Sequence, residues 1–374
     1  MKTALPLLIA LSACREDICF EPESGDPVAV ETDLTAFYRM FPWGDGSLIV
    51  GEADGAFVAQ SFSADAAPGE VVELGEMAGY PLDITVAEDG LAVLWAVDWE
   101  DTDPVHLEAQ RYDSAFQPMA EATRVVQLDD YDELFDGSLA WTGDGFGLLW
   151  GQRVGVDMVL SFMALDANLS PDFPKTIIGE ATWAGLQTEL VFNGENLGAS
   201  WVSTDQGAPW DYREFTVLSP SGVQAPEVTI LDEAEGSTLP TPLWTGEGWV
   251  LPVGTTIESD GYAGGLVIAN GFGPEGEPEI HRSLVGDLPE AVTDVEAAWD
   301  GDVGVIAWVS DGVLAVTPVD ASLEATDCTR TLDDVAASSL WSVERRGDQV
   351  RVWFFGDVDS DGALQIWDID LGAG

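Results

Sequence analysis

Short runs of alternating apolar and polar residues recur along the chain and are separated by turns rich in Asp and Gly. The segments 141–150 and 299–308 show the pattern clearly, because each begins with Trp, turns at a Gly-Asp pair and ends at a second Trp. An Asp/Gly turn between two β-rich apolar runs is typical of a β-hairpin. No long segment has the spacing of an amphipathic helix, so the pattern predicts an all-β protein.

The hairpin pattern repeats roughly every 50 residues. The acidic residue of the turn recurs at positions 45, 89, 144, 195, 247, 302 and 348. Two further apolar runs follow each hairpin, and fourth runs of this kind lie at 70–74, 124–128, 176–178 and 227–231. Four strands per unit in seven units predict a seven-bladed β-propeller with four-stranded blades.

The two ends of the chain predict how the ring of blades closes. The seventh unit ends at 364–369 and is one strand short, whereas the segment 27–34 resembles a fourth strand and precedes the first unit. Pairing of this N-terminal strand with the last blade would complete the ring and leave no open sheet edge there. We therefore expect a single propeller domain over residues 27–374.

The first residues have the features of an export signal. A single Lys precedes an apolar run at 4–11 that is too short to span a membrane. The sequence Leu11-Ser12-Ala13-Cys14 resembles the bacterial lipobox, which implies cleavage after residue 13 and lipidation of Cys14. Residues 1–13 would then be the signal peptide and 14–26 a lipidated tether. The alternative is an ordinary cleaved signal with an incidental cysteine.

The residue after the lipobox cysteine bears on the destination of the protein. It is Arg15, not the Asp that resembles an inner-membrane retention signal. The resemblance therefore favours a lipoprotein of the outer membrane, either periplasmic or surface-exposed.

Two cysteines remain if Cys14 carries lipid. Cys19 and Cys328 form a candidate disulfide, since an exported protein folds in an oxidising compartment. In the predicted fold, Cys19 precedes the outer strand of the seventh blade and Cys328 precedes that of the sixth. The alternative is two separate thiols, with Cys19 in a loose tether.

The charge of the chain excludes some partners. The sequence has 68 Asp and Glu against 13 Lys and Arg, for a formal charge of −55, yet 46% hydrophobic residues and 15 Trp argue against disorder. Such a surface repels phosphate backbones and anionic lipid head groups, so we expect no nucleic-acid partner and membrane contact through the N-terminal lipid alone. The partner would be a protein or a glycan.

One loop predicts a metal site. Asp357, Asp359 and Asp361 precede Gly362 in the order that calcium loops use, with Ala363 and Gln365 at positions seven and nine. The motif resembles the DxDxDG loops of EF-hands and of FG-GAP propeller repeats, which implies a bound Ca²⁺. It departs from them by having Asp368 at position twelve and Gln365 where FG-GAP loops have Asp. The alternative is a solvated acidic turn.

Other candidate chemistry rests on aromatic residues and carboxylates. The repeated Trp95, Trp150, Trp201 and Trp308 are expected to pack blade against blade. The unrepeated loop residues Trp99, Trp183 and Trp210 are the candidates for stacking on a sugar. With 68 acids, carboxylate pairs are too numerous to indicate a hydrolase, and no G-x-S-x-G motif occurs.

The sequence is similar to bacterial propeller lipoproteins in architecture. This resemblance implies a lipid-anchored, extracytoplasmic binding or scaffold protein that is not an enzyme and that calcium stabilises. Two alternatives stay open, a propeller hydrolase or lyase acting on a polysaccharide or peptide, and a carbohydrate-binding module that uses the loop tryptophans. Fold alone does not decide among them.

Overall fold

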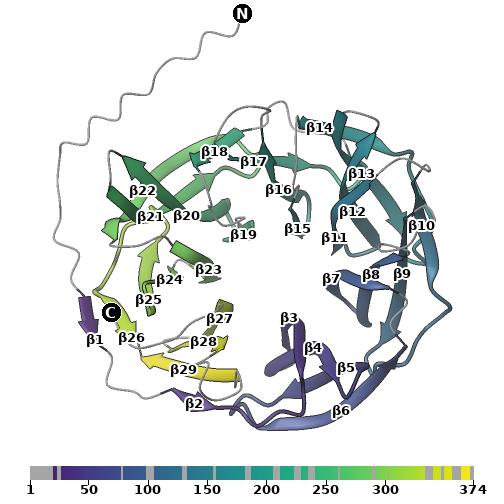
Figure 1. Cartoon of the computed structure of the whole chain (residues 1–374), viewed down its shortest axis with the longest axis horizontal. Helices are drawn as coiled ribbons and strands as arrows, with labels where there is room; N and C mark the ends of the chain where they lie inside the picture. The colour runs from purple at the N-terminus through teal and green to yellow at the C-terminus, as the bar shows by residue number, and fades with distance from the viewer. Residues whose placement is uncertain are drawn as a thin grey trace, which may run out of the picture.

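Seven sheets, six of four strands and one of five, stand around a central axis in the computed structural model (Figure 1). The structure describes residues 20–22, 27–76, 79–97, 105–128, 133–154, 157–181, 187–204, 211–222, 229–234, 241–259, 262–288, 292–301, 303–332, 340–346, 349–355 and 364–370. Within these ranges all regular elements are strands, and no helix could cross a membrane. The predicted all-β, seven-bladed propeller is confirmed.

Each blade contributes one strand to the axis and three strands outward from it. Blade 1 comprises β3 (Ala36–Trp43), β4 (Gly46–Ala53), β5 (Ala56–Phe62) and β6 (Pro68–Gly75). Blade 2 comprises β7 (Tyr80–Ala87), β8 (Gly90–Val97), β9 (His106–Asp113) and β10 (Thr123–Gln127). Blade 3 comprises β11 (Glu133–Trp141), β12 (Gly145–Val154), β13 (Asp157–Asp166) and β14 (Thr176–Ala181).

The remaining blades follow the same order. Blade 4 comprises β15 (Thr188–Phe192), β16 (Leu197–Thr204), β17 (Asp211–Leu218) and β18 (Thr229–Ala234). Blade 5 comprises β19 (Leu243–Trp244), β20 (Trp249–Ser259), β21 (Tyr262–Phe272) and β22 (Pro278–Leu288). Blade 6 comprises β23 (Val292–Asp300), β24 (Val303–Ser310), β25 (Val313–Asp320) and β26 (Thr329–Leu332). Blade 7 comprises β27 (Leu340–Arg346), β28 (Gln349–Phe355), β29 (Leu364–Asp370) and the N-terminal β2 (Val28–Ala29).

The N-terminal strand closes the ring, as predicted, but it is short. Only Val28 and Ala29 pair with β29, and the amide of Val30 adds one hydrogen bond of 2.8 Å to the carbonyl of Leu364. The side chains of Val30 and Leu34 are buried between blade 7 and blade 1. Closure therefore depends on these two apolar side chains as well as on the strand.

A second N-terminal strand lies outside blade 6. Strand β1 (Phe20–Pro22) pairs in parallel with β26, which makes blade 6 five-stranded. Figure 1 shows it at the outer edge of the ring, next to β26 and away from the axis. The sequence predicts a tether over residues 14–26 and no strand here, because a three-residue segment that ends in Pro has too little pattern to indicate one.

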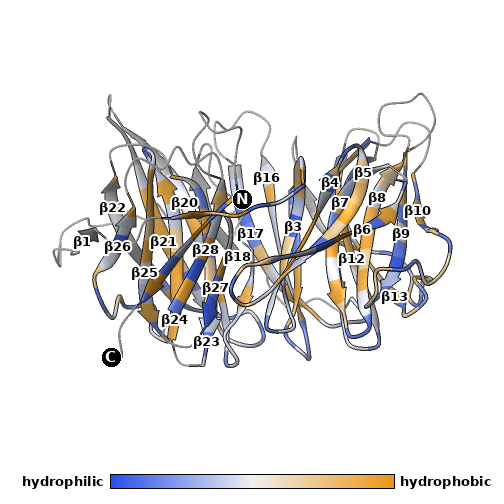
Figure 2. Ribbon diagram, turned by 90° about the horizontal axis from the view of Figure 1, so that it is seen from below, coloured by the Kyte–Doolittle hydropathy of each residue, from blue (hydrophilic) through white to orange (hydrophobic). Residues whose placement is uncertain are grey.

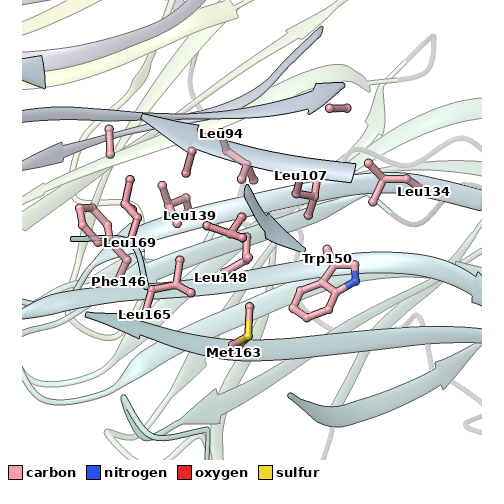
Figure 3. Packing of buried hydrophobic residues seen from close by; sticks show 14 of the residues in the cluster. Leu94, Leu107, Leu134, Leu139, Phe146, Leu148, Trp150, Met163, Leu165 and Leu169 are labelled. Carbon is pink, nitrogen blue, oxygen red and sulfur yellow. The ribbon is translucent and has the colours of Figure 1, made fainter. Parts of the chain in front are cut away.

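The hydrophobic core is divided among the seven blade interfaces. Seven clusters of buried residues each join two neighbouring blades. Figure 3 shows the cluster between blades 2 and 3, where Leu94 and Leu107 face Leu139, Leu148 and Trp150. Trp95, Trp150, Trp201 and Trp308 are at most 2% exposed, which agrees with the packing role predicted for them. Seen from the side, the hydrophobic residues follow the strands and many turns are hydrophilic (Figure 2).

The hairpins between the third and fourth strands share an unusual local structure. In blades 2, 3 and 6 the hairpin begins with Asp113, Asp166 or Asp320, whose Oδ1 accepts two backbone N–H bonds of 2.8–3.0 Å. Three residues later a side chain enters the core from a left-handed backbone, with φ of 60°, 63° and 58° at Phe116, Leu169 and Leu323. Blades 4 and 5 place Gly222 and Gly276 in this conformation, which glycine adopts at no steric cost.

Candidate functional site: an ion-pair cluster on the propeller axis

The axis of the propeller is crossed by an ion pair. Arg39 on β3 of blade 1 donates to both carboxylate oxygens of Glu189 on β15 of blade 4, at 3.2 and 3.1 Å. These blades face one another across the ring (Figure 1). The same guanidinium lies 3.4 Å from Asp83 Oδ1 on β7 of blade 2. Side chains of three blades thus meet where the seven innermost strands converge.

Solvent still reaches part of this cluster. The side chain of Arg39 is 35% exposed and that of Glu189 is 16% exposed, whereas Asp83 is 5% exposed. A bidentate Arg–carboxylate pair fixes both groups in one plane, which restricts the guanidinium to a defined orientation. The cluster therefore holds a partly exposed cation in a fixed orientation, with carboxylates around it.

Asp83 is held by the neighbouring blade as well as by Arg39. Its Oδ2 accepts hydrogen bonds from Ser138 Oγ at 3.0 Å and from the Leu139 amide at 2.7 Å, and its Oδ1 accepts one from the Ile84 amide at 2.7 Å. Burial raises the pKa of Asp83 to about 6, although Arg39 and the amides act in the opposite direction. This carboxyl therefore links the inner strands of blades 1, 2 and 3.

Two further carboxyls belong to the same electrostatic neighbourhood. Asp136 on β11 accepts a hydrogen bond of 2.8 Å from the Thr188 amide, and burial raises its pKa to about 7. Burial, followed by the charges of Asp294 and Glu189, raises the pKa of Glu296 on β23 to about 8. Glu189 in turn raises the pKa of Arg39, the largest influence on that group. The Arg39 guanidinium thus interacts with several carboxyls in the described part of the axis.

Backbone irregularities place these side chains. In four innermost strands the pairing register shifts next to a charged residue, at Arg39, Asp83, Asp136 and Asp294. A β-bulge bends the strand and redirects the side chain that follows it. In these four strands the charged residue therefore follows a bulge near the start of the strand, where the alternation of apolar and polar positions is interrupted.

This cluster was not predicted from the sequence, although the repeat contains a signal for it. A polar residue stands six positions before the acidic turn residue in all seven units. These residues are Arg39, Asp83, Ser138, Glu189, Thr241, Glu296 and Ser342. Aligning the units on their turns would have revealed a polar ring, although not which members pair across the axis.

Most of the predicted site residues lie outside the described part of the chain. This holds for Asp357, Asp359, Asp361 and Ala363 of the calcium loop, for Trp99, Trp183 and Trp210, and for Cys14 and Cys19. Gln365 lies on β29, paired with Phe354 and Ala29. Asp368 binds Arg351 through both oxygens, at 2.6 and 2.7 Å, so it belongs to an ion pair of blade 7. Within the described ranges, no group of three His, Cys, Asp or Glu could hold a metal ion.

The register of β1 bears on the predicted disulfide. Phe20 pairs with Thr329, so Cys19 and Cys328 are the residues immediately before a pair of aligned positions in parallel strands. Neighbouring parallel strands lie about 4.8 Å apart, within the range of Cα separations that a disulfide spans. Cys328 is disulfide-bonded, and its partner lies outside the described residues. The Cys19–Cys328 pairing stays a prediction.

Comparison with known proteins supports the fold and no more. No family model and no curated protein matches the chain. Among solved structures, the chain is similar to Kuenenia stuttgartiensis hydrazine synthase (TM-score 0.56, 11% identity, 91% of this chain and 97% of that one) and to an oligogalacturonate lyase in complex with manganese (0.54, 13%, 92% and 96%). It is also similar to a prolyl endopeptidase (0.54, 13%, 91% of this chain), of which it spans only 48%. At these identities the likeness extends to the propeller alone.

Proposed function

We propose that the protein is a lipid-anchored, extracytoplasmic binding propeller whose ligand is positively charged and binds at the axial cluster. The export signal and the lipobox-like sequence ending at Cys14 support the location, in the outer membrane. The meeting of Arg39, Glu189, Asp83 and Glu296 on the axis carries the proposal of a binding site.

The charge of the cluster supports a cationic ligand. Arg39 is already paired with Glu189 and Asp83, and among the described residues no ion pair joins Glu296 or Asp136 to a cation. A unit charge 4 Å from a carboxylate gains about 4 kcal/mol in surroundings of intermediate polarity. The strongly acidic protein attracts cations towards the axial cluster and repels anions from it.

Binding of amine probes tests this proposal. Thermal shift and calorimetry with spermidine and arginine methyl ester, at pH 8.5 so that Glu296 is ionised and in 0.3 M NaCl to suppress non-specific attraction, should show binding to the wild type. Glu296→Gln should weaken binding at least tenfold, and the exposed Glu279→Gln should leave it unchanged. Equal affinities for the two variants, or no binding at all, would contradict the proposed site.

A second candidate function is acid–base catalysis on a polysaccharide or peptide. Asp136 and Glu296 favour it, because carboxyls with pKa values of about 7 and 8 can exchange protons near neutral pH. The similarity to an oligogalacturonate lyase and a prolyl endopeptidase is consistent with such an activity. Release of unsaturated or reducing ends from polygalacturonate, abolished by Asp136→Asn, would support the enzyme.

A further inference from the structure

We infer that the outer edge of blade 6 faces the membrane, so that the disc is held by its rim and blades 2 and 3 point away from the lipid. This inference rests on the proposed lipidation of Cys14. It assigns an interaction surface, the rim that carries β1 and β26, and its partner, the lipid bilayer.

The position of β1 fixes where the tether leaves the disc. Phe20, Glu21 and Pro22 pair with Thr329, Arg330 and Thr331 on the outermost strand of blade 6. The chain reaches this point before it reaches the closing strand β2 in blade 7. Anything attached to the N-terminal residues is therefore attached to the rim of blade 6, and neither to the axis nor to the rim of blade 7.

The length of the tether limits the distance to the membrane. Only residues 15–19 separate Cys14 from β1. Six Cα-to-Cα steps lead from Cys14 to Phe20, and in a fully extended chain they span at most about 22 Å. The rim of blade 6 must therefore stay within that distance of the lipid head groups, and the disc has little freedom to turn its opposite rim towards them.

The acidic residues of this rim oppose close contact between the rim and an anionic bilayer. The blade 6 hairpin exposes Glu324 and Asp327, and Arg330 is paired with Asp327 at 3.2 Å. Anionic lipid head groups repel such a surface. The tether thus holds the rim near the membrane, while electrostatic repulsion opposes close contact between this acidic surface and the lipid.

Energy transfer to the membrane tests the orientation. Ser322 in blade 6 and Asn168 in blade 3 occupy the same exposed position of their hairpins, and the amide of each donates a 2.8 Å bond to the hairpin Asp. A fluorophore would be introduced at either position as a non-natural amino acid, which leaves the cysteines unchanged. The lipidated full chain would be reconstituted into vesicles of phosphatidylcholine with 20% phosphatidylglycerol and a head-group acceptor dye.

Transfer from Ser322 should exceed transfer from Asn168 at least twofold. Insertion of 40 Gly and Ser residues after Asp17 should make the two efficiencies equal, because the tether would no longer restrict the disc. Equal efficiencies in the unmodified chain, a reversed order, or a difference that survives the insertion would overturn the inference. If the wild type and Cys14→Ser both fail to float with the vesicles, the proposed lipidation has failed instead.

Discussion

Arg39 is the residue on which the axial cluster depends. It is the basic group that reaches both Glu189 across the ring and Asp83 on the neighbouring blade. Removing one partner of a fully buried ion pair typically costs about 3–5 kcal/mol. The Arg39 side chain is 35% exposed, so solvent screens the carboxylates left behind and the cost is smaller here. The role of Arg39 in stability can therefore be separated from any role in binding.

We expect Arg39→Met to lower the free energy of unfolding by about 1–2 kcal/mol, less than a fully buried pair would lose, measured by urea denaturation. The double variant Arg39→Met/Glu189→Met should lose less than the two single variants combined, since it leaves no unpaired charge between them. Arg124, which is 53% exposed in its side chain, provides the control. Replacement of Arg124 by Ala should change stability by less than about 0.5 kcal/mol. If Arg124→Ala and Arg39→Met lost comparable stability, the role assigned to Arg39 would be contradicted.

The raised pKa values of the axial carboxyls predict how stability depends on pH. Asp83, Asp136 and Glu296 have folded-state pKa values of about 6, 7 and 8, above their ordinary values near 4. Between pH 4 and 8 the folded protein therefore binds more protons than the unfolded chain, so stability falls as pH rises through this window. The melting temperature should be higher at pH 5.5 than at pH 8.5.

Replacement of Glu296 isolates its share of this dependence. Glu296→Gln cannot ionise, so it should raise the melting temperature relative to wild type at pH 8.5 and have little effect at pH 5.5. The exposed Glu279→Gln should give the same small change at both values, since it only reduces overall repulsion. Parallel pH profiles for wild type and Glu296→Gln would exclude Glu296 as a group with a raised pKa.

At the scale of single residues, the sequence predicted packing better than charge. Burial of Trp95 and Trp150 followed from their recurrence at one position of the repeat. The Arg39–Glu189 pair joins residues 150 positions apart, and nothing in either local sequence selects the partner. Ring closure brings them together, so the pairing becomes visible only in three dimensions.

At the scale of elements, the outer hairpins combine backbone strain with core packing. Leu169 adopts φ of 63° and is 3% exposed, and the two amide bonds to Asp166 Oδ1 hold the turn that allows this. A left-handed residue other than Gly or Asn costs about 1 kcal/mol or more, and the buried side chain offsets that cost.

Asp166→Ala should destabilise the protein by about 1–2 kcal/mol, because two backbone amides lose their acceptor. Asp113→Ala and Asp320→Ala in the matching hairpins should give similar losses in chemical denaturation. Asp172→Ala, an exposed position close to the same hairpin, serves as the control. If Asp172→Ala were as damaging as Asp166→Ala, the amide bonds would not explain the effect.

The N-terminal elements offer a second test at this scale. Deletion of the mature chain up to residue 26 removes β1 but keeps β2, whereas deletion up to residue 34 also removes the buried Val30 and Leu34. Each of these two side chains contributes about 1.5–3 kcal/mol by burial. The longer deletion should therefore lower the melting temperature much more than the shorter one, and equal losses would place the closure in β1 instead.

Calcium binding by the loop at 357–365 remains a prediction that metal removal can test. Addition of EDTA should lower the melting temperature of the wild type if Asp357, Asp359 and Asp361 bind Ca²⁺. The chelator should not change the melting temperature of Asp359→Ala. No effect on the wild type would favour the alternative of a solvated acidic turn.

Strands were predictable where they repeat and not where they are short. The fourth strand predicted at 70–74 lies within β6, and the one predicted at 124–128 matches β10 to within one residue at each end, because alternation and turn residues define them. Strand β1 has three residues and β2 has two, so neither carries a periodic signal of its own. The bulges at Arg39 and Asp83 interrupt the alternation, which concealed the most highly charged part of the innermost strands.

At the scale of the whole molecule, three arginines connect neighbouring blades. Arg111 of blade 2 binds the carbonyl of Ala167 in blade 3 and lies 5.5 Å from the ring of Trp141. Arg346 and Arg351 of blade 7 both donate to the carbonyl of Ala64 in blade 1, at 2.8 and 2.7 Å. In a chain of formal charge −55, these contacts join blades whose surfaces repel each other.

Salt should therefore stabilise the protein. Raising NaCl from 0.05 M to 1 M at pH 8 shortens the screening length from more than 10 Å to about 3 Å, which weakens the repulsion among exposed carboxylates more than the buried ion pairs. We expect the melting temperature to rise by several degrees, and by the same amount in KCl. A rise in NaCl alone would indicate a specific sodium site, and a fall would mean that ion pairs outweigh repulsion.

The order of β1 and β2 along the chain has a mechanical consequence. A pull from the N-terminal end loads the contact between β1 and β26 before any tension reaches the two-residue contact between β2 and β29. The fifth strand of blade 6 therefore protects the contact that closes the ring from such a pull. In the proposed lipid-anchored state, a lateral pull through the lipid would load blade 6 first and leave the blades assembled.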